Sequence, residues 1–463
     1  MDYDVLVLGG GIIGCAVAYE LSKYSLNIAL IEKDYDIASD VALTNTAIVY
    51  DGVECDSTLM AKLEFMGNSM FRQVTEKFNI PFKKCGSLIT ASGSKGEEKV
   101  NKLYKQALDR GIEYVQLLSG EEARSMEPSL SEKVTKALYS PNTGVTCPYD
   151  LAITYGEIAF DNGVIFRLAE EVLNIEDISK GVRVTTNKNR FTCRMVVNTT
   201  PGEYYSIDMD KKISYHEKEY MNYFLMEKEE DLYSMIVSSI GEDEKKAYYI
   251  NTLTDHNLVS VKAEDKLSLD NTVEEAQSLI DSIDRNRIDS FYSIPYKDDD
   301  IVIDDSYLVD GYIRIIGKHY GHVTMTPYIA KMVCETIVGN LNAKLKKDFK
   351  DRRRETYNFR KLSNEERQKL IEMNKRYGNV ICQCNMITEG EIVDCIRRPL
   401  GARTLEGVQR RTGVTLGKCK GAYCINKVVS ILARETNRQL TDIVKNSKKS
   451  KILLNRIKEF DSV

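Results

Sequence analysis

The first 34 residues constrain the fold more than any other stretch of this 463-residue chain. Residues 2–34 read DYDVLVLGGGIIGCAVAYELSKYSLNIALIEKD, a pattern that predicts a short apolar strand, a glycine-rich turn, an apolar helix and a second apolar strand. Gly9, Gly11 and Gly14 form the pattern G-x-G-x-x-G directly after the first strand. This order of elements is typical of the first βαβ unit of a dinucleotide-binding domain.

Each of these residues has a physical role in holding a dinucleotide. Gly9 permits the tight turn, Gly11 lets the backbone approach a pyrophosphate, and Gly14 lets the helix pack closely on the strand. The helix offers N–H groups and a partial positive charge to the phosphates. Glu32 ends the second strand 23 residues after Gly9, where its carboxylate can accept both ribose hydroxyls, and Lys33 follows it. A purely structural glycine turn would not explain why strand, helix and acid come in this order.

Length and composition exclude other classes of protein. The length predicts two to four domains. Lys and Arg total 64 and Asp and Glu total 69, which gives a formal net charge of −5, so no overall basic field points to nucleic acid. There is no run of about 18 apolar residues that could span a bilayer, and no signal-type segment precedes the first strand. These features predict a soluble, cytoplasmic protein.

The eleven cysteines are divided between scattered and clustered positions. In a reducing compartment, clustered thiols indicate a metal site rather than disulfides. The scattered ones are interpreted as small buried hydrophobic residues: Cys15, Cys55, Cys85, Cys147, Cys193 and Cys334.

Residues 36–52, DIASDVALTNTAIVYDG, bear on the choice between NAD and FAD. The glycine pattern serves both, although its place at the N-terminus of a long chain favours a flavoprotein. The segment resembles the second flavin motif of the D-amino-acid oxidase-like superfamily, in its glycerol-3-phosphate dehydrogenase-like branch. There a hydroxyl-rich turn passes under the FAD pyrophosphate and the flavin ring. The resemblance implies FAD as the cofactor, and the matching positions are Asn45, Thr46, Ala47, Ile48 and Val49.

Two segments in the middle of the chain resemble the same branch. Residues 144–176 resemble its Asp-Pro-Tyr-x-Leu segment, and the resemblance places Val172 at the adenine through backbone groups. Residues 194–205 resemble the strand end beside the cofactor, with Thr199 and Gly202 at the matching positions.

Residues 311–339 resemble the closing strand and helix of the branch. The N-terminus of that helix faces the pyrimidine edge of the flavin, where its positive dipole would stabilise the anionic reduced flavin. The family's Gly-Leu-Thr corresponds here to His322, Val323 and Thr324. The resemblance covers residues 1 to about 345.

Several positions depart from the family pattern on the flavin or substrate side. Tyr50 stands where the family often has His, and Ala42 and Leu43 stand where a hydroxyl and a Lys are expected. The substrate-side Gly-Leu-Arg-Pro corresponds to residues 293–296, with Pro295 in place of the anion-binding Arg. The resemblance therefore implies FAD binding, while the substrate stays open among small hydroxy and amino compounds, with glycerol 3-phosphate in question.

Candidate catalytic residues lie in the closing segment. A dehydrogenase that removes hydride from a C–H bond needs a base for the hydroxyl or amino proton. His319 or His322 could supply it, Lys318 could hold an anionic group of the substrate, and the resemblance places Tyr50 on the flavin or substrate side as well. The alternative is that these residues only line the cofactor.

Four thiols near the C-terminus form two tight pairs, with 34 residues between the pairs. They are Cys382-x-Cys384 and Cys419-x4-Cys424. The stretch resembles the bacterioferritin-associated ferredoxin-like [2Fe-2S] domain as it occurs behind glycerol-3-phosphate dehydrogenase-like flavoproteins, and the resemblance implies that these four thiolates hold two irons. A zinc site is the alternative, although C-x-C is tighter than the usual zinc spacing, and unligated thiols are the third reading.

The residues between the two pairs predict two short amphipathic helices. They cover 388–398 and 404–413 and begin near Thr388 and Thr404. Cys395 lies on the first of them and is interpreted as packed rather than ligating. The last helix is expected to continue over 425–463, with a lysine-rich surface turn at 445–451.

The chain is therefore predicted to be an α/β (α+β) two-domain flavoprotein followed by a small helical [2Fe-2S] domain. Its first part combines a Rossmann-like FAD-binding domain with an antiparallel-sheet substrate domain, and an alternating run over 220–227 supports strands in the latter. The charged segment before the thiols is predicted to be a helical linker with a solvated face. The expected boundaries are 1–345 for the oxidoreductase region, 346–377 for the linker and 378–463 for the [2Fe-2S] domain. Within the oxidoreductase region, the FAD-binding segments are expected at about 1–79, 141–202 and 306–345, and the substrate domain at about 80–140 and 203–305.

Together these parts predict an FAD-dependent dehydrogenase that oxidises a small hydroxy or amino substrate by hydride transfer. A flavin accepts two electrons and a [2Fe-2S] centre passes one at a time, so the electrons would leave singly toward a partner. The resemblance implies a second, NAD-linked flavoprotein subunit and a small cysteine-rich protein as partners. The alternatives are a non-catalytic electron-relay subunit of such a complex and, less favoured, an iron-handling module.

Overall fold

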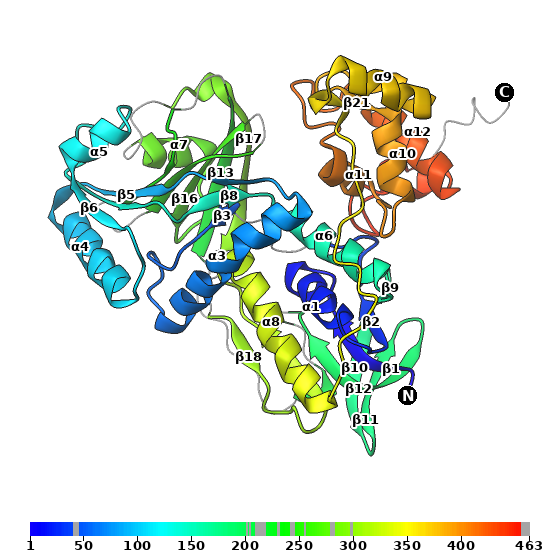
Figure 1. The fold of residues 1–463 in the computed structure, drawn as a ribbon. Helices are drawn as coiled ribbons and strands as arrows, with labels where there is room; N and C mark the ends of the chain where they lie inside the picture. Colours follow the sequence, from blue (N-terminus) through cyan, green and yellow to red (C-terminus); the bar gives the residue numbers. More distant parts are fainter. Residues whose placement is uncertain are drawn as a thin grey trace.

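The computed structural model describes residues 1–39, 46–200, 202, 205–208, 219–228, 232–240, 246–253, 256–277, 283–296 and 300–454. Figure 1 shows a lower region around one sheet, an upper-left region around a second sheet, and a group of C-terminal helices in orange and red. The predicted α/β (α+β) class is confirmed. The predicted cofactor residue Asn45, with Ala42 and Leu43, lies outside the described residues. Over those that are described, no helix has the length and hydropathy that a bilayer span requires.

The first sheet contains the two strands that flank the glycine turn. Its members are β1 (Tyr3–Leu8), β2 (Ile28–Ile31), β9 (Ile165–Arg167), β10 (Val172–Ile178), β11 (Gly181–Thr186), β12 (Arg190–Asn198), β18 (Val302–Asp304) and β19 (Tyr312–Ile316). Their order is β10-β11-β12-β1-β2-β9, and β19 also pairs with β12 and with β18. β1 runs parallel to β2 and β12, so the carboxyl ends of these strands meet at one edge, the usual place for a ligand in such sheets.

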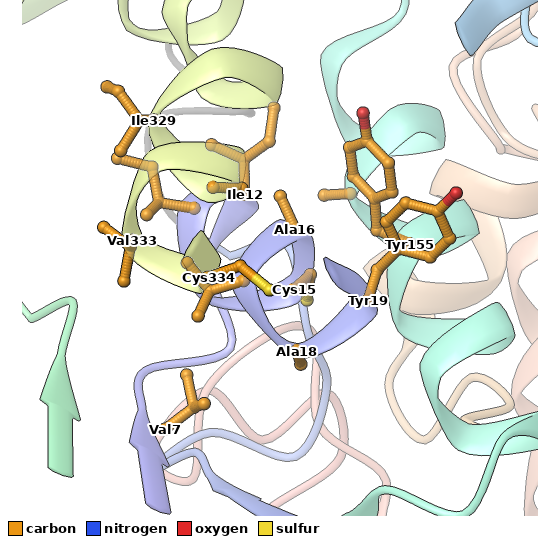
Figure 2. Close-up of a cluster of buried hydrophobic side chains, with 14 of the residues drawn as sticks. Val7, Ile12, Cys15, Ala16, Ala18, Tyr19, Tyr155, Ile329, Val333 and Cys334 are labelled. Carbon is orange, nitrogen blue, oxygen red and sulfur yellow. The ribbon is translucent and has the colours of Figure 1, made fainter. Parts of the chain in front are cut away.

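Helix α1 (Ile12–Ser22) lies between α6 (Pro148–Asp161) and α8 (His322–Leu341) in the core of this region. Figure 2 shows Tyr19 of α1 beside Tyr155 of α6, with ring centroids 5.1 Å apart, and Val333 and Cys334 of α8 on the other side of α1. Almost every residue of α1 is buried. A helix that is apolar on all sides must be covered on all sides, and this fixes the helix whose N-terminus the glycine turn presents.

The second sheet forms the predicted substrate-side region. Its order is β17 (Ile288–Tyr296), β13 (Glu219–Glu227), β16 (His256–Ala263), β15 (Lys246–Asn251), β14 (Ile236–Ile240), β5 (Ser87–Ala91), β7 (Lys136–Ser140) and β6 (Gln116–Ser119). The strand expected at 220–227 is confirmed as β13. The sheet is antiparallel as predicted except at one place, where β14 and β5 run parallel. These two strands come from separate stretches of chain, so no hairpin sets their direction.

Smaller elements complete this region. Helices α4 (Gly93–Asp109), α5 (Gly120–Met126) and α7 (Leu269–Gln277) belong to it, and α3 (Thr58–Phe78) packs along α8. A small sheet is formed by β3 (Ile48–Val49), β8 (Gly144–Thr146) and β4 (Phe82–Lys84).

The charged segment over 346–377, predicted to be a solvated helical linker, is mostly exposed as predicted but is helical only in its second half. Before α9 (Asn364–Met373) it is irregular apart from a 3-10 turn at Phe359–Lys361, and in Figure 1 it runs in yellow past α6 to the C-terminal helices. Arg353 pairs with Asp150 at 2.7 Å, and Arg354 pairs with Asp161 at 2.6 Å, so both bind the acidic side of α6. These tertiary ion pairs outweigh the local helix propensity of the segment.

The C-terminal unit consists of short elements around its own core. They are β20 (Val380–Cys382), β21 (Ile387–Thr388), α10 (Glu389–Arg397), α11 (Leu405–Thr412) and α12 (Ile425–Thr436). The predicted helix starts are confirmed, since the side chains of Thr388 and Thr404 cap α10 and α11. Asn437 adopts a left-handed conformation and ends α12, so the expected continuation of this helix is wrong. Within the described residues, a bridge between Val444 and Lys451 closes the predicted surface turn.

Candidate functional site

The glycine turn has the geometry that the sequence predicts. Gly9 has φ +97°, a conformation that favours glycine, at the end of β1. A Cβ on Gly14 would lie 2.0 Å from the carbonyl oxygen of Gly9, so helix and strand approach too closely for any other residue. Gly11 precedes α1, which begins without a side-chain cap. The N-terminus of α1 therefore fits a pyrophosphate.

Glu32 lies beside this turn. Its Oε2 accepts the N–H of Gly10 at 2.6 Å, and its Oε1 accepts the N–H of Asp34 at 2.8 Å. Each carboxylate oxygen has a second lone pair, so this arrangement leaves the carboxylate able to accept a ribose hydroxyl.

A cavity next to Glu32 brings together predicted cofactor residues from separate segments. Glu32 and Lys33 directly follow β2, and Val172 begins β10. The full lining is Leu8, Gly9, Ile31, Glu32, Lys33, Glu170, Glu171, Val172, Thr200 and Tyr205. A carboxylate, a backbone edge and apolar walls together fit the adenosine end of a dinucleotide. Thr199 instead donates to the carbonyl of Leu8 at 2.8 Å, and Gly202 is exposed.

The second predicted flavin motif leads from this region toward α8. Ala47 has φ +65°, a conformation that glycine adopts more readily, and Ile48 begins β3. The hydroxyl of Thr46 lies 3.3 Å from that of Tyr50, and the N–H of Tyr50 donates to Oγ1 of Thr324 at 3.0 Å. The motif is thereby joined to the first turn of α8.

The N-terminus of α8 is buried and carries a partial positive charge. His322, Val323 and Thr324 form its first turn, and all three side chains are buried. Glu64 of α3 lies against this end, because a Cβ at Gly321 would fall 2.0 Å from Oε1 of Glu64. The fully buried carboxylate of Glu64 is thus placed where the helix dipole stabilises a negative charge.

His319 is held by contacts on both of its ring nitrogens. Nδ1 accepts the N–H of Gly321 at 3.1 Å and lies 3.7 Å from Oε1 of Glu64, while Nε2 lies 3.7 Å from Sγ of Cys55. Burial, with a further contribution from His322, lowers the pKa of His319 to about 4, so the imidazole is neutral at pH 7.

The side chains of Cys55, Glu64 and His319 have the chemistry of metal ligands, with ligand atoms within 4.8 Å of one another. Their hydrogen bonding argues against a metal. Because Nδ1 of His319 accepts a hydrogen bond from the N–H of Gly321, the neutral ring carries its own proton on Nε2, which then has no lone pair to offer beside Cys55. The cluster instead fixes the plane of the imidazole.

We expect the burial of His319 to make the protein less stable in acid. Its folded pKa of about 4 lies below the ordinary value of 6.5. Between these values the unfolded chain binds a proton that the folded chain does not, so the free energy of unfolding falls as the pH drops from 6.5 to 4. The loss is about 3 kcal/mol. Denaturant unfolding at pH 7 and pH 4 should show this extra loss in the wild type relative to His319→Gln; equal losses would contradict it.

Tyr50 is buried among aromatic rings and does not titrate near neutral pH. Burial raises the pKa of its phenol, and the Glu54 carboxylate adds to the rise. Its ring meets that of Tyr320 edge-on, with centroids 4.8 Å apart. The phenol therefore stays protonated and can donate a hydrogen bond but cannot act as a base. Lys318 is exposed, and the catalytic roles of Lys318, His319, His322 and Tyr50 stay predictions.

Sequence reasoning missed a buried polar group close to Tyr50. Oε2 of Glu54 accepts the hydroxyl of Tyr248 at 3.2 Å and lies 3.9 Å from Nζ of Lys246. Burial raises the pKa of the Glu54 carboxyl. The only signal was the acidic stretch DGVECDS at 51–57, directly after the flavin motif, in which Asp51 and Asp56 lie on either side of Glu54. Pro295 lies on β17 opposite Tyr220 and is exposed.

The four clustered thiols come together from two loops. Cys382 ends β20 and Cys384 follows it, while Cys419 and Cys424 precede α12. The thiols of Cys419 and Cys384 interact, as do those of Cys424 and Cys382. Gly417 permits the approach, because a Cβ there would lie 2.3 Å from Cβ of Cys384.

This set of four thiols fits a [2Fe-2S] cluster. Cys382 and Cys424 are buried, whereas Cys384 is exposed, so the site reaches the surface on one side. Cys395 donates to the carbonyl of Ile392 at 3.1 Å inside α10, which confirms that it is packed. Of the six scattered cysteines, Cys85 and Cys147 are only half-buried and the other four are buried as predicted.

Comparisons with known proteins match both parts of the chain. Residues 4–336 match the FAD dependent oxidoreductase family, and residues 380–434 match the BFD-like [2Fe-2S] binding domain. A glycerol 3-phosphate dehydrogenase of Caloramator mitchellensis is 33% identical over 97% of this chain and 98% of its own length. The mitochondrial L-2-hydroxyglutarate dehydrogenase of Caenorhabditis briggsae is 28% identical over 47% of this chain and 54% of its own length.

Solved structures share the fold of the oxidoreductase region. The dithionite-reduced L-alpha-glycerophosphate oxidase of Mycoplasma pneumoniae with FAD bound superimposes with a TM-score of 0.66 at 20% identity. The match covers 77% of this chain and 99% of the oxidase. The two cofactors inferred from the residues, FAD and a [2Fe-2S] cluster, are therefore those of the matching families. The chain belongs to the FAD dependent oxidoreductase family and carries a BFD-like [2Fe-2S] binding domain behind its oxidoreductase region.

Proposed function

We propose that this FAD-dependent dehydrogenase oxidises glycerol 3-phosphate, or a closely related small hydroxy compound, and passes the electrons through its [2Fe-2S] cluster to a partner. One observation supports this choice of substrate. The relative that is 33% identical over 97% of the chain spans both the oxidoreductase region and the iron–sulfur domain, and it is a glycerol 3-phosphate dehydrogenase.

The residues around the N-terminal end of α8 suggest how the protein takes part in the oxidation of the substrate. When bound, FAD accepts a hydride from a C–H bond and the cluster carries single electrons. His319 is neutral at pH 7, but its Nδ1 accepts the N–H of Gly321 and its Nε2 carries the ring proton, so we propose that His322 takes up the proton of the substrate hydroxyl. Tyr50 stays protonated and is proposed to donate a hydrogen bond on the same side. Lys318, which is exposed, is proposed to meet the anionic group of an incoming substrate.

Recognition of the phosphate must differ from the family pattern. Pro295 has no N–H to donate where the resemblance expects an arginine, so another basic side chain must bind the phosphate. Besides Lys318, a second basic residue near Tyr50 is Lys246, which lies beside Glu54 and Tyr248. Glycerol 3-phosphate should therefore be compared with a substrate that carries carboxylates instead of a phosphate, such as L-2-hydroxyglutarate.

The place of the iron–sulfur domain supports transfer of electrons within the chain. Lys420, between Cys419 and Cys424, donates to the carbonyl of Asp289 at 2.8 Å and lies 3.0 Å from its carboxylate. The cysteine loop therefore rests against β17 of the second sheet. Cys384 and Tyr423 beside it are exposed, which offers a place for electrons to leave.

We propose that the partners are an NAD-linked flavoprotein subunit and a small cysteine-rich protein in the cytoplasm. The chain has a single G-x-G-x-x-G pattern next to a βαβ unit, at Gly9–Gly14, so a second dinucleotide would need another subunit. All eleven cysteines are described, and none forms a disulfide, as is usual in a reducing compartment.

Anaerobic mixing with candidate substrates tests the proposal. Glycerol 3-phosphate should bleach the flavin absorbance at a lower concentration than L-2-hydroxyglutarate or an amino acid. Bleaching at a lower concentration by another of these compounds would identify that compound as the substrate instead. If none bleaches the flavin, while a partner protein does, the chain would be an electron-relay subunit rather than the dehydrogenase.

A further inference from the structure

A buried ion pair joins the C-terminal unit to the FAD-binding part. Arg411 of α11 binds Asp36 through two parallel bonds, from Nη1 to Oδ2 at 2.7 Å and from Nη2 to Oδ1 at 2.8 Å. The two side chains are only 6% and 2% exposed. Gly407 makes room for the pair, since a Cβ there would lie 2.4 Å from Oδ2 of Asp36. Bidentate pairs of this kind fix orientation as well as distance.

The neighbouring arginine holds the loop that follows Asp36. Nη1 of Arg410 donates to the carbonyl of Ala38 at 2.8 Å and to that of Ile37 at 3.3 Å. The N–H of Ala38 in turn donates to the carbonyl of Gly10 at 2.9 Å. A continuous set of contacts thus runs from α11, through residues 36–38, into the glycine turn that faces the dinucleotide.

A second contact fixes the same unit against α6. Leu400 belongs to the core around α1. It lies close to Gly156 of α6, because a Cβ added at Gly156 would be 3.3 Å from Cδ1 of Leu400. Arg398 pairs with the buried Glu157 through bonds of 3.0 and 3.3 Å. The C-terminal unit is therefore part of the packing behind α1, rather than a module on a tether.

We propose that Arg410 and Arg411 are positioning residues for FAD, so that the iron–sulfur domain completes the dinucleotide site. FAD should bind weakly when the arginines no longer hold residues 36–38 against Gly10. The coupling is reciprocal. If docking of the iron–sulfur domain strengthens FAD binding, bound FAD must stabilise the docked domain by the same factor. Bound FAD should therefore slow the loss of iron from the C-terminal unit.

The first test measures the dissociation constant of FAD for deflavinated full-length protein by quenching of FAD fluorescence. Arg411→Met should weaken FAD binding by about 5- to 150-fold, the usual range of coupling between sites. Asp36→Asn should act in the same direction, and the double variant should be no worse than either single one. Arg411→Lys should recover part of the affinity. The matched control is Arg434→Met, an exposed arginine of the same unit that pairs with Glu389 at 2.6 Å, and it should leave FAD binding unchanged.

A second measurement does not depend on FAD affinity. The rate at which a chelator removes iron should be lower in wild-type protein with FAD than without it, and this difference should vanish in Arg411→Met. If Arg411→Met does not fold, Arg410→Gln serves in both tests; it removes the bonds to the carbonyls of Ile37 and Ala38, together with one bond of 3.2 Å inside α11 to the carbonyl of Glu406, and leaves the pair of Arg411 with Asp36 in place. Unchanged FAD affinity in Arg410→Gln and Arg411→Met, or equal iron loss with and without FAD in the wild type, would overturn the proposal.

Discussion

A Gly14→Ala protein is expected to keep its iron and lose its FAD. The new Cβ would lie 2.0 Å from the carbonyl oxygen of Gly9 and 2.9 Å from the hydroxyl of Thr199, so the backbone of the turn must move. Overpacking of this kind costs about 1–3 kcal/mol. It also moves the N–H groups of α1 away from the pyrophosphate. Flavin content after purification should fall to less than about one tenth of the wild-type value, a loss of about 1.4 kcal/mol or more in binding.

Gly339→Ala is the matched control for this experiment. Gly339 lies near the end of α8, and nothing stands within 4 Å of a Cβ added there. Alanine favours a helix over glycine by about 1 kcal/mol, so this protein should bind FAD normally and be no less stable. Normal flavin content in Gly14→Ala would mean that the glycine turn does not hold the cofactor.

Removal of a clustered thiol should have an equally large effect at the other end of the chain. Cys424 is buried and lies beside Cys382, so Cys424→Ser replaces a thiolate ligand by a hydroxyl that binds iron poorly. We expect the iron content to fall from about two per chain to well below one. Analysis of iron, zinc and acid-labile sulfide in anaerobically purified protein measures it.

Cys395→Ala separates the ligating thiols from the packed one. Cys395 is buried inside α10, and its thiol donates to a carbonyl of its own helix turn. Its replacement should leave the iron content unchanged and cost about 1 kcal/mol of stability from the small cavity. Iron loss in this protein, or one equivalent of zinc and no sulfide in the wild type, would contradict the assignment of the four ligands.

Features set by local chemistry could be predicted from the sequence. The turn at Gly9 and Gly14 depends on close approaches within one βαβ unit, and the starts of α10 and α11 depend on Thr388 and Thr404 as caps. The direction of β14 against β5 could not be predicted, because residues far apart in the chain decide it.

Long-range charge pairing accounts for most of what was missed. The segment with Arg353 and Arg354 has the composition of a solvated helix, and only the acidic side of α6 explains why it is not helical there. Arg411 and Asp36 are separated by 375 positions, and neither has a neighbour in sequence that marks it. The spacing from the glycine turn placed Glu32 at the cofactor, and the resemblance to known flavoproteins placed Val172 there. The cavity that they share lies between segments that periodicity alone would not bring together.

The most direct test of the central claim is electron paramagnetic resonance of the anaerobic protein after addition of the substrate that bleaches its flavin. If FAD and the iron centre act in one electron path, the signal of a reduced [2Fe-2S] cluster should appear in the wild type and be absent in Cys424→Ser. A bleached flavin beside a cluster that stays oxidised and silent would contradict the account.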